Sequence, residues 1–104
     1  MISLQALPIM SSFQTMRVTG TVRSQPIHML IDSGSTHNFL DSTIAKKLRC
    51  ELLKIPPIAV AVADGAQLNC QSMCTRFIWT LGGTEYVTDA YIVPLGGYDM
   101  GLGV

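Results

Sequence analysis

The sequence is poor in charged residues. Only 13% of its 104 residues are Asp, Glu, Lys or Arg, and seven basic side chains balance seven acidic ones. A chain without net charge offers no electrostatic attraction for nucleic acid or for an anionic membrane surface, so neither is an expected partner. Hydrophobic residues make up 48% of the chain. This share is high for a small soluble monomer, and we expect a partner subunit to cover part of it.

Long apolar stretches are also absent. No run approaches the ~20 residues that a membrane-spanning helix needs. The opening MISLQALPIMSSF has neither the basic n-region nor the long apolar region of a signal peptide. The three cysteines, Cys50, Cys70 and Cys74, are an odd number, which fits a reduced protein better than a secreted disulfide scaffold. We therefore expect an intracellular, cytoplasmic protein. The two histidines and three cysteines show no CxxC or HxxxH spacing, so no metal site is predicted.

A chain of this length holds one small domain, and its pattern predicts mostly strands. Alternating apolar and polar residues, separated by Gly and Pro turns, predict strands at residues 2–7, 13–22, 27–31, 58–62, 67–81 and 85–93. Residues 40–48 predict a short helix capped by Asp41 or Ser42, and the prolines of KIPPI predict a break. A hairpin turn is expected at Asp64-Gly65. Many strands with one helix indicate an all-β barrel or sandwich.

One carboxylate stands out from this pattern. The stretch MLIDSGST places Asp32 at the end of an apolar, buried strand and directly before a turn of small residues. An ionised carboxylate away from water is costly unless something compensates it. Because D-S-G is also a common turn tripeptide, Asp32 is either a simple turn residue or a working group. These residues alone leave both interpretations open.

The surrounding segments carry a resemblance to a known family. LIDSGSTHNFL resembles the active-site loop of aspartic proteases. Its context resembles the retropepsin-like protease domain of plant gypsy-type LTR retrotransposon polyproteins: TMRVTGTV precedes the loop, VAVADGAQL stands at the flap hairpin, and YIVPLGGYDMGLGV matches the closing segment. The resemblance covers nearly the whole chain. It implies a single domain over residues 1–104, folded as a small closed retropepsin-like barrel with one short helix.

The resemblance implies a role for each residue of the loop and the flap. Asp32 is the expected catalytic acid, and Ser33 and Gly34 complete the catalytic triplet; Gly34 permits the tight turn and brings its N–H near the carboxylate. Substrate binding is assigned to Ser35 and to the flap residues Ala63, Asp64 and Gly65. Ser35 is also expected to donate a hydrogen bond to Asp32. The chemistry needs no metal and no cofactor.

The triplet occurs once in the chain, so one copy carries half of a catalytic pair. The resemblance therefore implies a homodimer with two Asp32 carboxylates on its symmetry axis. Two close carboxylates share one proton, and together they activate a water and protonate the scissile carbonyl. The implied function is an aspartic endopeptidase that cleaves polypeptides, its own polyprotein among them.

Two departures from the family pattern favour a second hypothesis. Gly101 stands where the family has Ile or Val, and the chain stops at Val104, before the expected C-terminal strand. We expect the domain to be truncated at its C-terminal end, to dimerise poorly and to be a weak or silent enzyme. The alternative function is therefore a catalytically inactive remnant that serves as a dimerisation or peptide-binding module. A reading frame that continues into a reverse transcriptase would favour the enzyme.

Several other residues receive plain structural interpretations. Phe77 and Trp79 share one strand phase and are expected in the core or an interface rather than in a ligand platform. His37 is interpreted as a loop residue, and Asp99, next to the closing strand, as a structural acid.

Overall fold

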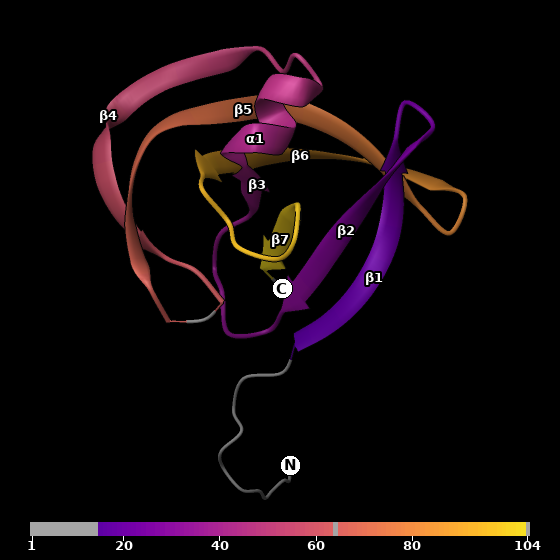
Figure 1. Cartoon of the computed structure of the whole chain (residues 1–104), viewed down its shortest axis with the longest axis horizontal. Helices are drawn as coiled ribbons and strands as arrows, with labels where there is room; N and C mark the ends of the chain where they lie inside the picture. Colours follow the sequence, from indigo (N-terminus) through magenta and orange to yellow (C-terminus); the bar gives the residue numbers. More distant parts are fainter. Residues whose placement is uncertain (1–14, 64, 104) are drawn as a thin grey trace, which may run out of the picture.

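The computed structural model describes residues 15–63 and 65–103 (Figure 1). These residues form seven strands and one helix: β1 Thr15–Val22, β2 Gln25–Asp32, β3 Phe39–Asp41, α1 Ser42–Lys47, β4 Leu52–Ala61, β5 Gln67–Leu81, β6 Thr84–Val93 and β7 Met100–Gly103. The predicted all-β class with one short helix is confirmed. The strand predicted at residues 2–7 lies outside the described residues. No helix of the described part is long and apolar enough to cross a membrane.

The strands form a single sheet that curls into a ring (Figure 1). Their order is β1-β2-β7-β3-β6-β5-β4, and β1 also pairs with β5. This last pairing joins Thr21 to Thr80 and is one residue long, so the sheet is ring-like rather than a full barrel. The closing strand β7 lies inside the order, parallel to β2 and antiparallel to β3. The chain therefore returns to the end of β2, where Asp32 lies.

Gly20 permits the closure of the ring. A Cβ atom at this position would lie 2.7 Å from Met29 Sδ and 2.7 Å from Thr80 O. Real Cβ atoms essentially never lie this close to other atoms, so β1 approaches β5 this closely because Gly20 has no side chain. Next to it, the hydroxyl groups of Thr21 and Thr80 are hydrogen-bonded to each other.

The first two strands follow the alternation of apolar and polar residues in the sequence. In β1, Gly20 and Val22 are buried while Arg17 and Thr19 are exposed, and in β2 the buried side chains include Ile27 and Met29. A two-residue turn joins the strands. Its residues Arg23 and Ser24 both have positive φ, 49° and 68°, as the tight hairpin turns that match strand twist require.

The short helix begins where β3 ends. The side chain of Asp41 accepts hydrogen bonds from Thr43 N at 3.1 Å and Ile44 N at 3.3 Å, so Asp41, not Ser42, is the N-cap. The sequence did not predict β3. This strand has three residues and pairs in parallel with β6 and antiparallel with β7, so its partners lie far away along the chain, where local patterns carry no information.

The predicted break at KIPPI is wrong. Strand β4 continues through Pro56 and Pro57, and its pairing with β5 shifts register between Lys54 and Ile58. β4 lies at the edge of the sheet order, next to β5 alone. Prolines are tolerated at a sheet edge and at bulges because the missing N–H removes no inner ladder bond.

Two clusters of buried side chains make up the core. The larger one fills the ring and contains Phe77 and Trp79, each 5% exposed, which confirms their predicted core position. Trp79 Nε1 donates to Thr88 Oγ1 at 3.0 Å, so its polar atom is satisfied. The smaller cluster joins the β4–β5 hairpin to β3 and β6; it consists of Phe39, Val60, Val62, Cys70 and Val93. It fixes the hairpin next to the strand that follows the Asp32 loop.

Candidate active site

Asp32 is the last residue of β2 and is held on both sides. It pairs with Thr15 of β1 and with Gly103 of β7, and it is 7% exposed. Because neighbours on both sides fix the strand, the backbone that carries this carboxyl group is rigid. A buried carboxylate on a rigid strand end is the arrangement that a preorganised catalytic acid requires.

The loop after Asp32 turns back on it. Gly34 N–H donates to Asp32 Oδ1 at 2.9 Å, and Ser35 N–H donates to Asp32 O at 3.2 Å. The first bond confirms that Gly34 brings its N–H to the carboxylate. A backbone N–H directed at an oxygen of Asp32 holds the carboxyl group in one orientation.

Ser35 does not make the hydrogen bond to Asp32 that we expected. Its Oγ donates to His37 O at 3.0 Å and accepts from His37 N at 3.3 Å. A hydroxyl has one proton to donate, and this loop turn uses it. His37 is a loop residue, as predicted, and its ring lies edge-on to Tyr91 at 5.3 Å between centroids. Ser35 and His37 therefore shape the loop.

Gly103 packs directly beneath this loop. A Cβ atom on Gly103 would lie 2.6 Å from Ser35 O, 2.8 Å from His37 O and 2.9 Å from His37 N. These are backbone atoms, so no side-chain movement could make room. The closing segment therefore needs glycine at this position, in agreement with the resemblance to retropepsins.

Asn38 is a site residue that the sequence analysis missed. Its Oδ1 accepts from Gly103 N at 3.0 Å, and its Nδ2 donates to Asp89 O at 3.4 Å. One amide side chain thus ties the Asp32 loop to β7 and β6. In the sequence, only the position of Asn38 at the end of the loop could have pointed to this role. No local pattern distinguishes it from an ordinary turn residue.

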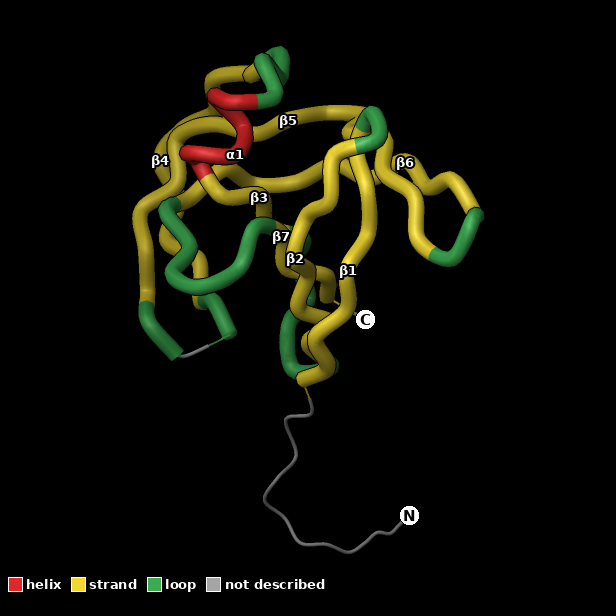
Figure 2. Tube along the Cα trace, turned by 45° about the vertical axis from the view of Figure 1, so that its right-hand side comes forward, coloured by secondary structure: helices red, strands yellow, loops and turns green. Residues whose placement is uncertain are grey.

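The flap turn lies at the same end of the molecule as the Asp32 loop (Figure 2). The turn is closed by hydrogen bonds from Val62 N to Ala66 O at 3.0 Å and from Gly65 N to Val62 O at 2.9 Å, with Gly65 at φ 88°. Ala63 lines a small cavity of about 10 Å³ together with Asp32 and Ser35. The structure therefore brings these three predicted site residues together. Asp64 lies outside the described residues.

Gly101 leaves part of this cavity unfilled. The residue is buried and lines the same cavity. A Cβ on it would lie 3.4 Å from Tyr98 Cε2 and 3.7 Å from Phe39 Cδ2, which are ordinary contact distances. The backbone would therefore accept alanine here, in contrast to Gly103.

Two further acids near the site serve the structure. Asp99 Oδ2 accepts from His28 N at 2.8 Å, and its backbone bonds to His28 O and Asp41 N, so its predicted structural role is confirmed. Asp41 is buried like Asp32, but its side chain accepts N–H bonds from Thr43, Ile44 and Leu95. No group of three or more His, Cys, Asp or Glu side chains within residues 15–63 and 65–103 could hold a metal ion.

Comparison with known proteins agrees with this geometry. No curated protein matches the chain. A family model described as aspartyl protease matches residues 18–103. The matched segment contains the Asp32 loop, the flap hairpin and Gly103 beneath the loop, and it spans most of the sequence. The chain therefore belongs to an aspartyl protease family.

Proposed function

We propose that this protein is an aspartic endopeptidase that works as a homodimer, with one Asp32 from each copy. One observation carries the proposal. Asp32 is a buried carboxylate on a fixed strand end, with the Gly34 N–H on its Oδ1 and a loop that Gly103 supports from below. Ala63 of the flap turn lies at the same small cavity, where a bound peptide would meet both.

The chemistry follows from pairing two such carboxylates. Like charges a few ångströms apart do not both ionise readily, so the pair holds one proton. The ionised carboxylate takes a proton from a water molecule, which attacks the scissile carbonyl carbon. The protonated carboxylic acid gives its proton to the carbonyl oxygen. No metal and no covalent intermediate is needed.

The second acid has to come from a second copy of the chain. The D-S-G triplet occurs once in the sequence. Asp41, the other buried acid of the described part, uses its carboxylate for three backbone N–H groups. A two-fold axis that passes near Asp32 would place two identical loops face to face, as an isologous dimer requires.

We further propose that the substrate is the polyprotein that contains this domain, of the gypsy-type retrotransposon class in plants, and that the protein acts inside the cell. The family match supports a peptide substrate. The likeness of the loop, flap and closing segment to retrotransposon proteases supports the narrower assignment. The odd cysteine count supports an intracellular setting.

The test is a peptide-cleavage assay on the wild type and on Asp32→Asn. We expect Asp32→Asn to fold normally and to lose hydrolysis completely, because an amide cannot act as the base. Glu85→Gln is the matched control, since it makes the same chemical change on the β5–β6 hairpin and should keep the full rate. Full activity of Asp32→Asn would refute the proposal.

The remnant hypothesis has one observation in its favour, the space that Gly101 leaves beside Asp32. An inactive binding module would form dimers in sedimentation and bind a statine-type peptide without cleaving any peptide. An active enzyme would cleave peptides and be inhibited by the same compound. Both readouts come from the wild-type protein, so they separate the two functions directly.

A further inference from the structure

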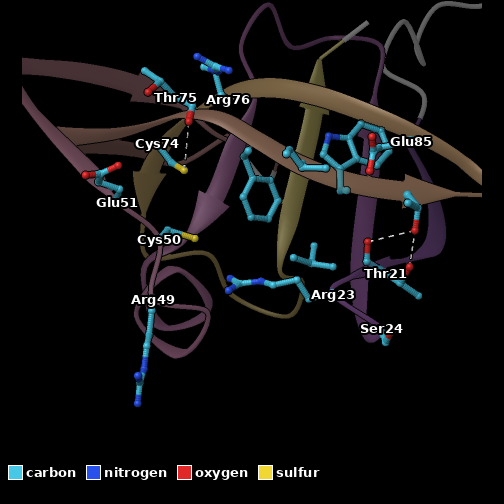
Figure 3. Close-up of a pocket in the computed structure, with 15 residues that line it drawn as sticks. Thr21, Arg23, Ser24, Arg49, Cys50, Glu51, Cys74, Thr75, Arg76 and Glu85 are labelled. Atoms are coloured by element: carbon cyan, nitrogen blue, oxygen red, sulfur yellow. Dashed lines mark hydrogen bonds between the residues drawn. The ribbon is translucent and has the colours of Figure 1, made fainter.

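A groove of about 860 Å³ lies apart from the Asp32 loop (Figure 3). Three segments form most of its lining: the β1–β2 turn at residues 21–24, the α1–β4 connection at residues 49–51, and β5 at residues 74–80. Neither Asp32 nor the described residues of the flap turn line it. The candidate active site therefore leaves this groove unexplained.

The groove follows a gap along one edge of β5. On this edge, β4 pairs with β5 as far as Cys74, and β1 pairs with it at Thr80. Between them, no strand of the described part pairs with residues 75–79, whereas β6 covers the opposite edge from Phe77 onward. Five residues of strand edge span roughly 17 Å at about 3.4 Å per residue. A short piece of extended chain has the length of this gap.

The backbone of Ile78 directs its polar groups into the gap. In an antiparallel pair, residues whose N–H and C=O face the partner strand alternate with residues whose groups face away. A two-residue turn with positive φ joins β5 to β6, so the residues that flank it, Leu81 and Thr84, are hydrogen-bonded to each other. Ile78 lies three residues before Leu81. Its N–H and C=O therefore face away from β6.

A contact at Thr80 supports this orientation independently. Thr80 O lies 2.7 Å from the point that a Cβ atom of Gly20 would occupy, so this carbonyl faces β1 and not β6. Ile78 lies two residues earlier on the same strand and has the same orientation. Its side chain is 51% exposed. An unpaired N–H and C=O on a strand edge are the groups to which an added strand binds.

The borders of the groove are basic. Arg23 reaches from the β1–β2 turn and donates to Leu48 O, so it bridges two of the segments that border the gap (Figure 3). Arg49 and Arg76 lie at opposite borders in the same view. Within residues 15–63 and 65–103, neither of these two guanidinium groups has a hydrogen-bond or ion-pair partner. Three arginines against two glutamates in the lining favour an acidic occupant.

We propose that this groove binds an extended, acidic segment of a polypeptide, which adds to the open edge of β5 as a short strand between β4 and β1. The segment runs antiparallel to β5, as β4 and β1 do. Its backbone exchanges hydrogen bonds with the N–H and C=O of Ile78, and its carboxylate meets Arg76 or Arg49. Backbone pairing supplies the affinity, and the carboxylate selects acidic segments. Binding here does not involve Asp32.

The experiment measures the binding of a fluorescein-labelled heptapeptide of alternating threonine and valine with one glutamate, by fluorescence anisotropy. The Asp32→Asn protein is used so that the probe stays intact, and the result therefore does not depend on whether the protein is a protease. We expect saturable binding. The same peptide with glutamine in place of glutamate should bind about threefold more weakly, and so should the glutamate peptide to Arg76→Gln, the order expected for an exposed ion pair.

Matched proline variants test the backbone pairing. Ile78→Pro removes the N–H that faces the groove. Val87→Pro makes the same change on its cross-strand neighbour, whose N–H also faces away from the β5–β6 ladder but not into the groove. Ile78→Pro should weaken peptide binding by about tenfold, because it removes one hydrogen bond and leaves its acceptor unpaired. Val87→Pro should leave binding unchanged.

Hydrogen exchange tests the same pairing without a proline substitution. Saturating peptide should slow exchange of the Ile78 amide by about tenfold or more and leave exchange of the Val87 amide unchanged. A peptide that does not bind at millimolar concentration, that binds equally well with glutamine, or that protects the Asp32 loop instead of Ile78 would overturn the proposal. A dimer that Ile78→Pro dissociates would also overturn it, because a second copy would then occupy this edge.

Discussion

At the scale of single residues, two glycine positions of β7 differ in whether they have space for a side chain. A Cβ on Gly101 would make contacts of 3.4 Å or longer, whereas a Cβ on Gly103 would lie within 2.9 Å of three backbone atoms of the Asp32 loop. Gly101 also lacks the positive φ that would exclude other residues. The two positions are two residues apart on the same short strand, so substitutions at them form a matched pair.

We expect Gly101→Ala to raise the free energy of unfolding by about 0.5–1 kcal/mol, because it reduces the entropy of the unfolded chain and fills part of a cavity. Gly103→Ala should lower it by about 1–3 kcal/mol through backbone displacement. Urea denaturation of the three proteins measures both effects. A destabilised Gly101→Ala variant would show that the space beside Phe39 and Tyr98 does not admit a methyl group.

A second residue-scale prediction concerns the thiols and pH. Burial, together with the smaller effects of the nearby Cys50 and Asp89, raises the pKa of Cys74 to about 11. Burial also raises the pKa of Cys50, although the hydrogen bond from Cys74 and the positive charge of Arg23 lower it. Both thiols thus hold their protons more tightly in the folded state than in the unfolded chain.

The unfolded chain therefore loses these protons first as pH rises above about 9, and the stabilisation present below that pH is lost toward pH 11. We expect the free energy of unfolding, measured in reducing buffer, to fall more steeply over this range in the wild type than in Cys74→Ala. Subtracting the variant removes the contribution of tyrosines and lysines. Equal slopes would contradict the raised pKa of Cys74.

At the scale of elements, the sequence predicted what local patterns encode. Strand β5 was predicted with its observed bounds, and the residue types reduced the helix cap to Asp41 or Ser42, of which the structure shows Asp41. The three residues of β3 and the prolines within β4 were missed because their strand character depends on distant partners and on an edge position. The Gly34 N–H on Asp32 was predictable from the motif, whereas the use of the Ser35 hydroxyl by His37 was not.

The flap turn allows a test at this scale. Gly65 and Gly83 have nearly the same φ, 88° and 82°, and a Cβ on either would meet no atom within 4 Å. Replacing either by alanine should cost about 1 kcal/mol through backbone strain alone. Gly65 lies in the turn that carries Ala63, whereas Gly83 lies in the β5–β6 turn.

We therefore expect both Gly65→Ala and Gly83→Ala to lose similar stability, and Gly65→Ala alone to lower kcat/KM for peptide cleavage. The comparison removes general destabilisation as an explanation. Equal kcat/KM values for the two variants would mean that the flap turn does not act on the substrate.

At the scale of the whole molecule, apolar surface remains uncovered in the single chain. Met16 is 57% exposed and pairs with Ile31, next to Asp32, so part of this surface lies at the end where the proposed two-fold axis would pass. Ile78 and Val87, 51% and 59% exposed, face each other on the β5–β6 hairpin. The apolar surplus of the sequence is thus present at the proposed interface, although it is not confined to it.

The proposed dimer can be tested by mixing wild-type subunits with inactive ones. If each site takes one Asp32 from each copy, adding an equal amount of Asp32→Asn protein should convert about half of the wild-type subunits into inactive mixed dimers. The peptide-cleavage rate should then fall by about half at concentrations above the dimer midpoint found by sedimentation.

Below that midpoint, the specific activity of the wild type should decline on dilution, because single chains carry half a site. Adding Glu85→Gln protein instead should raise the rate, since its Asp32 is intact. A specific activity that neither dilution nor Asp32→Asn protein reduces would mean that one chain hydrolyses peptides alone.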